Sequence, residues 1–231
     1  MSSSVVFDFH MHTFLSDGAL LPIELIRRCI VHGYAGMAIA DHASASTLER
    51  VITEGARDCA LARKHWDFEV YPGVELTHVP ATAIAELAAQ AKAAGAALVV
   101  VHGESPVEPV QPGTNLAAAQ CPEVDVLAHP GLLTPEVAKA ARENGVMIEL
   151  TSRQGHGMAN GLVAQVALAA GASMVVNSDT HRPEDILTPQ WAEHVARCSG
   201  VSPEMLETIL DTNPRALLAR ARSRMTSEET Q

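Results

Sequence analysis

The sequence V-V-F-D-F-H-M-H, residues 5–12, joins a short apolar run to two histidines that stand two positions apart. The apolar run is typical of a buried β-strand. Side chains two residues apart on an extended chain point the same way, so His10 and His12 can bind one metal ion from one side. The stretch therefore predicts a first strand that leads into a metal site.

Similar apolar runs recur along the chain at a spacing of roughly 22–34 residues, which is the length of one strand–helix unit. We predict seven strands: Val5–Phe9, Gly36–Ala40, Val70–Glu75, Ala97–Val101, Val124–Ala128, Val146–Leu150 and Met174–Asn177. The helices predicted around them are Pro22–His32, Thr47–His65, Ala81–Ala94, Pro135–Asn144, Gly161–Ala170 and Pro203–Arg220. The stretch Gln111–Gln120 indicates at most a short helix. Strand–helix alternation predicts a parallel sheet.

Nearly every predicted strand ends in a possible metal ligand. In chain order these residues are His10, His12, Asp17, His42, Glu75, His78, His102, His129, Asp179 and His181. A doubly wound open sheet gathers its chemistry at one switch point, whereas a barrel brings the ends of all its strands to one centre. The sequence therefore predicts an α/β barrel with its site at the C-terminal ends of the strands.

Imidazole and carboxylate ligands together suit Zn²⁺, Mn²⁺ or Fe²⁺ better than Ca²⁺. Without His78, which we expect to line the pocket, nine candidate ligands remain, too many for one ion. Two or three divalent ions that share a bridging carboxylate fit this number. Asp8, Glu104 and Glu149 are candidates for orienting the imidazoles, and a purely structural role fits them as well. Three further histidines lie in predicted helices and are interpreted as surface residues: His32, His65 and His194.

Composition limits the class of protein. The chain has 231 residues, of which 47% are hydrophobic and 19% charged, so we expect one globular domain over residues 1–222 and a polar, disordered tail over 223–231. A net charge of −11 and only 3% aromatic residues argue against nucleic-acid binding. Four cysteines without a C-x-x-C pair are typical of a reducing compartment. With no signal peptide or membrane span indicated, we expect a cytoplasmic protein; the oligomeric state stays open.

The ordered motifs D-F-H-M-H-T, S-D-G, A-D-H, G-V-E, A-H-P-G and S-D-T-H resemble those of the polymerase and histidinol phosphatase (PHP) family, from Val5 to about Arg220. The resemblance implies a distorted (β/α)7 TIM-like barrel and a trinuclear centre that hydrolyses phosphoesters. It also implies three ligand sets: His10, His12, Glu75 and Asp179; Glu75, His102 and His129; and Asp17, His42 and His181. Some members carry histidine where this chain has Asp17, which is a competent ligand for a hard cation.

The expected activity is a phosphoric monoester hydrolase of the histidinol-phosphatase-like kind, acting on a small phosphorylated metabolite or a nucleotide through attack of metal-bound hydroxide. Arg153 and Arg182 are candidates to bind the phosphate, and His156 or His78 to protonate the leaving group. A solvated loop position is the alternative for each arginine. Two other functions stay open: an amidohydrolase-type C–N hydrolase, and a non-catalytic metal-binding regulatory module. The amidohydrolase is disfavoured because the fourth predicted strand is followed by His102 rather than by a lysine able to bridge two metals.

Overall fold

The computed structural model describes residues 5–228. Seven parallel strands form a barrel in the order β1-β2-β4-β5-β6-β7-β8, and a short β3 pairs with β4. Their bounds are β1 Val6–Asp8, β2 Tyr34–Ile39, β3 His42–Ala43, β4 Val70–Leu76, β5 Leu98–His102, β6 Val126–Ala128, β7 Met147–Thr151 and β8 Met174–Asn177. A parallel bridge between Met11 and Thr180 brings the ends of β1 and β8 together, so the barrel is nearly closed. All seven predicted strands are present, and the predicted barrel is confirmed.

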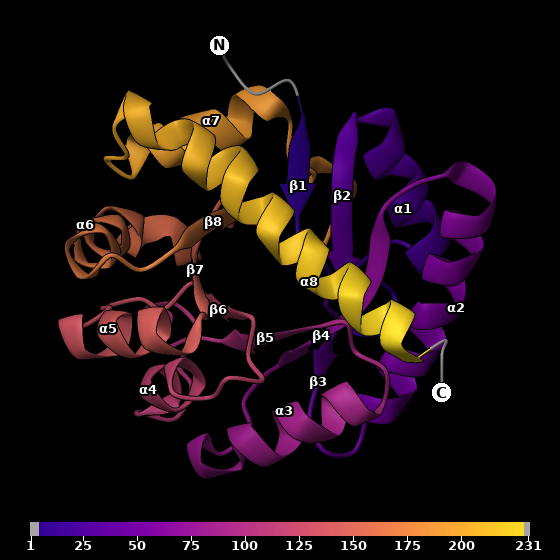
Figure 1. The fold of residues 1–231 in the computed structure, drawn as a ribbon, viewed down its shortest axis with the longest axis horizontal. Helices are drawn as coiled ribbons and strands as arrows, with labels where there is room; N and C mark the ends of the chain where they lie inside the picture. Colours follow the sequence, from indigo (N-terminus) through magenta and orange to yellow (C-terminus); the bar gives the residue numbers. More distant parts are fainter. Residues whose placement is uncertain (1–4, 229–231) are drawn as a thin grey trace.

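Helices surround the barrel, as Figure 1 shows. They are α1 Pro22–Val31, α2 Leu48–Trp66, α3 Ile84–Ala93, α4 Thr114–Ala119, α5 Pro135–Asn144, α6 Asn160–Ala170, α7 Pro189–Cys198 and α8 Asn213–Glu228. Short turns of 3-10 or π helix precede several of them: Ala81–Ala83, His156–Ala159, Pro183–Asp185, Pro203–Met205 and Thr208–Thr212. The sequence reading missed α7, although Thr188 caps it by accepting a hydrogen bond from the Trp191 amide and Pro189 fills its first turn.

The last helix closes the end of the barrel opposite the strand-end histidines. In Figure 1, α8 crosses in front of the strands. Its buried Leu217 and Leu218 pack with an interior group of strand residues that includes Phe7 and Leu98. Arg224 donates hydrogen bonds to the carbonyl of Ala97, just before β5, and to Asp125, just before β6. The C-terminal ends of the strands are thus left for the site.

The C-terminal helical region differs from its prediction. The expected single helix over Pro203–Arg220 is divided into three segments, and its last part continues to Glu228. Arg222 and Arg224 form ion pairs with Glu69 and Asp125, which attach this extension to the barrel. The first part of the predicted tail is therefore helical, and residues 229–231 lie outside the described range. None of the helices in residues 5–228 is long and apolar enough to cross a membrane.

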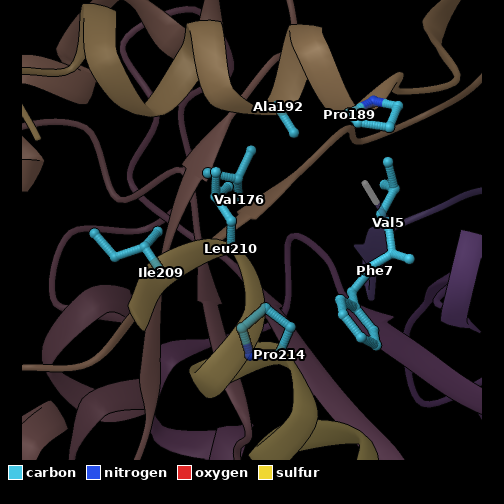
Figure 2. A pocket seen from close by; sticks show the side chains of 9 residues that line it. Val5, Phe7, Val176, Pro189, Ala192, Ile209, Leu210 and Pro214 are labelled. Carbon is cyan, nitrogen blue, oxygen red and sulfur yellow. The ribbon is translucent and has the colours of Figure 1, made fainter. Parts of the chain in front are cut away.

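A small apolar cavity lies between β1, β8 and the helical segments after β8 (Figure 2). Val5, Phe7, Val176 and Leu210 are among the side chains that line it. Its volume of about 10 Å³ is close to the least that can hold a single water molecule. This cavity is a packing defect rather than a ligand site.

Candidate metal centre

The first group of side chains at the site comes from β4 and from the segments directly after β1 and β8. His10 Nε2 lies 3.2 Å from Glu75 Oε1, and His12 Nε2 lies 3.3 Å from Asp179 Oδ1. The two imidazole rings, 5.0 Å apart between centroids, lie on the same side of the chain, as their spacing predicts. His10, His12 and Asp179 each offer one donor atom within 4.8 Å of the others, and all three are buried.

A second group lies nearer to solvent. His12, Asp17, His42 and His181 offer donor atoms that all lie within 4.8 Å of one another. Asp17 Oδ1 is 3.2 Å from His181 Nε2 and 3.6 Å from His42 Nε2. The Asp17 side chain is 58% exposed, so this group forms the outer edge of the site.

The third group consists of His102, His129 and His156, whose donor atoms also lie within 4.8 Å of one another. The His129 ring centroid is 4.5 Å from that of His102 and 4.4 Å from that of His156. Glu75 connects the groups: its carboxylate contacts His10, His42 and, at 3.8 Å, His129 Nε2. A carboxylate in that position can bridge ions.

Unpaired donor atoms show that the residues fit bound metal. In the described part of the chain, seven buried side-chain atoms lack a hydrogen-bond partner, and all seven belong to this centre. They are His10 Nε2, His12 Nδ1 and Nε2, Glu75 Oε1, His129 Nδ1, His156 Nδ1 and Asp179 Oδ1. Four of these atoms approach one another in the ion pairs His10–Glu75 and His12–Asp179. Burying polar groups without hydrogen bonds is costly, whereas imidazole and carboxylate groups are good ligands for a divalent cation.

The backbone is strained at the same place. His129 and Asp179 have φ values of 25° and 55°, in the left-handed region that residues other than glycine rarely adopt. Strain of this kind persists where the surrounding structure holds it, and it gathers at functional sites. Both residues aim donor atoms into the centre, with His129 Nε2 3.6 Å from Asp179 Oδ2.

Electrostatics within the centre are strongly perturbed. Burial and the neighbouring His42 lower the pKa of His12 to about 4, so its imidazole is neutral and ready to bind a metal. Burial would raise the pKa of Glu75, yet the nearby His10 and His42 hold that pKa well below its usual range. Burial would also lower the pKa of His181, but hydrogen bonding to Asp17 and Asp179 raises it to about 10.

A layer of polar residues lies behind the candidate ligands. Glu149 Oε2 is 2.8 Å from His10 Nδ1 and 2.9 Å from Asn177 Nδ2. Burial raises the pKa of Asp8 to about 7, and this carboxylate accepts hydrogen bonds from the amides of His10 and Ser178. Glu149 therefore contacts the ring of His10, as an orienting residue would, whereas Asp8 contacts only backbone amides and fixes the chain before and after the candidate ligands.

Two more carboxylates shape loops. Glu104 accepts hydrogen bonds from the amides of Gly113 and Asn115, so it orders a loop rather than an imidazole. Asp41, next to His42, accepts hydrogen bonds from the Thr13 amide at 2.7 Å and the Thr13 hydroxyl at 2.6 Å. Asp41 thereby fixes the loop that carries Asp17. The A-D-H motif marks its position, but sequence reasoning assigned a role only to His42.

The four residues predicted to act on substrate have different surroundings. His156 is buried beside the third group, whereas His78 is 51% exposed and lies 3.1 Å from Glu108. Arg153 is paired with Asp185 at 3.2 Å, and Arg182 is exposed after β8. The sequence reading named neither Glu108 nor Asp185. Glu108 lies in a loop and Asp185 ends the 3-10 turn Pro183–Asp185, so neither stands in a segment with a periodic sequence signal.

No family model matches the chain. Over 237 residues it is 27% identical to ribonuclease P protein component 3 of Methanosarcina mazei, a match that covers 96% of this chain and 92% of that protein. In solved structures, a protein from Acinetobacter baumannii assigned as a 2-pyrone-4,6-dicarboxylic acid hydrolase matches with a TM-score of 0.59 and 11% identity, over 95% of this chain and 100% of the other.

A protein from Bifidobacterium adolescentis assigned as a metal-dependent phosphoesterase matches with a TM-score of 0.51 and 16% identity, over 94% of this chain and 96% of the other. Identities this low show a shared fold.

A more similar relative has no assigned activity. Uncharacterized protein MJ1295 of Methanocaldococcus jannaschii is 43% identical over 215 residues, which cover 93% of this chain and 99% of that protein. The chain therefore belongs to the same family as this M. jannaschii protein.

Proposed function

We propose that the protein is a metal-dependent phosphoesterase that hydrolyses small phosphate monoesters. The observation that carries the proposal is the convergence of strand-end histidines and carboxylates on one centre, in which seven buried side-chain atoms lack a hydrogen bond. The ordered motifs and the fold shared with the Bifidobacterium protein add support.

Three ligand sets would hold the ions. One consists of His10, His12, Glu75 and Asp179, a second of Glu75, His102 and His129, and a third of Asp17, His42 and His181. Bound divalent ions would supply an activated water and offset the charge of a phosphoryl group. The exposed Asp17 at the outer edge makes the third set the one most open to solvent.

The chain's own residues then position the substrate and the proton. His78, half exposed beside His102, is the side chain that we propose donates a proton to the leaving oxygen. Arg182 is exposed directly after His181 and could meet a phosphate, and Arg153 is held by Asp185 of the 3-10 turn Pro183–Asp185. As the substrate we propose a small ester of the histidinol phosphate or nucleotide kind.

Amide or lactone hydrolysis is the second candidate, because the A. baumannii hydrolase shares the barrel. The histidine at the end of β5, where a bridging lysine would be needed, favours the phosphoesterase. The acidic charge of −11 disfavours an RNA-binding role like that suggested by the ribonuclease P relative.

A substrate panel tests the proposal. Protein loaded with Mn²⁺ or Zn²⁺ is offered histidinol phosphate, nucleotides, other phosphate monoesters, amides and lactones, with phosphate or acid release as readout. Turnover of at least one monoester is expected, and His129→Ala should abolish it while circular dichroism stays unchanged. Turnover of amides or lactones with none on any ester would contradict the proposal.

A further inference from the structure

His156 is buried beside the other candidate metal ligands, whereas a residue that donates a proton to the leaving group would be expected nearer to solvent. It opens the short helical turn His156–Ala159 after β7, and only 8% of the residue is exposed. Its donor atom lies within 4.8 Å of those of His102 and His129, and its Nδ1 is among the unpaired buried atoms. The imidazole therefore faces the third group of the centre.

Glu108 faces the same group from the loop between β5 and α4. Its Oε2 lies 3.5 Å from His102 Nε2 and 3.7 Å from His156 Nε2. Its Oε1 lies 3.1 Å from His78 Nε2, which holds the carboxylate from the solvent side. Glu108 thus directs one oxygen toward two imidazoles that already converge.

The two loops that carry these residues are fitted to each other. Gly155, directly before His156, has φ of +87°, and a Cβ there would lie 3.3 Å from the side chain of Val107, directly before Glu108. The close approach and the left-handed backbone both favour glycine at this position. The neighbouring loops therefore place His156 and Glu108 beside each other.

We propose that His156 and Glu108 join His102 and His129 as ligands of one ion, the ion that Glu75 would share with its neighbour. Three imidazoles and the carboxylate of Glu108, together with the bridging Glu75, are donors of the kind that Zn²⁺ and related ions accept. Glu108, whose side chain is 43% exposed, is the outermost of the four and faces incoming substrate. This assignment rests on the metal centre of the proposed function and moves His156 from proton donor to ligand.

The test measures metal alone, without substrate. Metal-free wild type, Glu108→Gln and His156→Gln are titrated with Zn²⁺ against a chromophoric chelator, and the visible spectrum of Co²⁺ reports the ligands. Glu123→Gln, an exposed carboxylate at the far end of the barrel, is the matched control. Circular dichroism checks that each variant is folded.

Each of the two variants should bind one ion at least about tenfold more weakly and show a changed Co²⁺ spectrum. Even mutation of a residue that only hydrogen-bonds to a metal ligand typically lowers metal affinity by that factor. The remaining ions and the control should keep wild-type affinity. Unchanged affinity and spectrum in either variant would overturn the four-residue site. If His156→Gln does not fold, the metal affinity and Co²⁺ spectrum of Glu108→Gln alone decide the test. The metal titration uses no substrate, so its outcome does not depend on the substrate panel. A protein that binds ions as proposed but hydrolyses no ester in that panel would contradict only the proposed function.

Discussion

Glu149 links two of the candidate ligands from behind. It contacts the His10 ring through Oε2, and it accepts a hydrogen bond from the His129 amide through Oε1 at 3.3 Å. A buried carboxylate in this position fixes the ring orientation of one ligand and the strained backbone of another. It does so without facing the substrate.

Glu149→Gln should therefore lower metal affinity and turnover together, by about 10–100-fold, because the amide gives His10 a neutral partner in place of a charged one. Zn²⁺ titration and steady-state kinetics measure the two effects. Glu123→Gln serves as the control, with wild-type values expected. Wild-type metal affinity in Glu149→Gln would show that the contact with His10 has no influence on the centre.

The raised pKa of His181 predicts how the stability of the metal-free protein depends on pH. Its pKa rises from 6.5 to about 10 in the folded state, so its stabilising contribution is complete below pH 6.5 and disappears as pH rises through 10. The free energy of unfolding should consequently fall more between pH 7 and pH 10 in wild type than in His181→Gln. Urea unfolding at several pH values measures the difference. Equal slopes in the two proteins would contradict the raised pKa.

The positions of the candidate ligands could be predicted because each follows an apolar strand, and the ends of parallel strands meet in space. Glu108 and Asp185 could not be predicted in this way. Their contacts depend on the paths of loops, and one residue more or less in a loop redirects a side chain without altering any sequence period. For the same reason His156 was expected at the mouth and lies buried.

The presence or absence of a sequence pattern explains why some elements were predicted and others were not. Strands β4 and β5 are continuous apolar runs, as buried parallel strands are, and their bounds agree with prediction to within one or two residues. The two-residue β3 and the π turn Thr208–Thr212 have no such pattern, because tertiary contacts define them. Helix α7 had a readable N-terminal signal in Thr188 and Pro189.

The close packing around Gly103, directly after β5, predicts that a side chain at this position would lower stability and metal affinity. A Cβ there would lie 2.2 Å from the carbonyl oxygen of Ala128 and 2.8 Å from Cα of Pro130, both backbone atoms that cannot move aside easily. Gly103→Ala should push the ends of β5 and β6 apart and displace the adjacent His102 and His129. We expect about 1–3 kcal/mol lower stability and a loss of metal affinity.

Gly161 in α6 is the matched control, because a Cβ there meets nothing within 4 Å. Gly161→Ala should leave metal affinity unchanged and raise stability slightly, by the helix preference of alanine. Urea unfolding and Zn²⁺ titration compare the two variants. A Gly103→Ala protein as stable and as metal-competent as Gly161→Ala would show that the junction tolerates a side chain.

Closure of the barrel and the metal centre depend on the same contacts. The His12 amide donates a hydrogen bond to the Thr180 carbonyl at 2.8 Å, and the Phe9 amide donates one to Asn177 Oδ1 at 2.9 Å. These bonds join β1 to β8, the first strand to the last. The same two chain segments carry His10, His12 and Asp179, so ions at this centre would connect the two ends of the barrel.

Removal of metal should therefore destabilise the entire barrel. An ion that binds only the folded state at a thousandfold excess over its Kd contributes about 4 kcal/mol. For a chain of this length that corresponds to a shift in Tm of roughly 8–16 °C. Calorimetry of chelator-treated protein, before and after Zn²⁺ or Mn²⁺ is added, measures the shift. Asp179→Asn should show a smaller shift, since it replaces a carboxylate that follows β8 and contacts the two histidines that follow β1. An identical Tm with and without metal would mean that the centre does not hold ions tightly, and that its unpaired donor atoms are satisfied in another way.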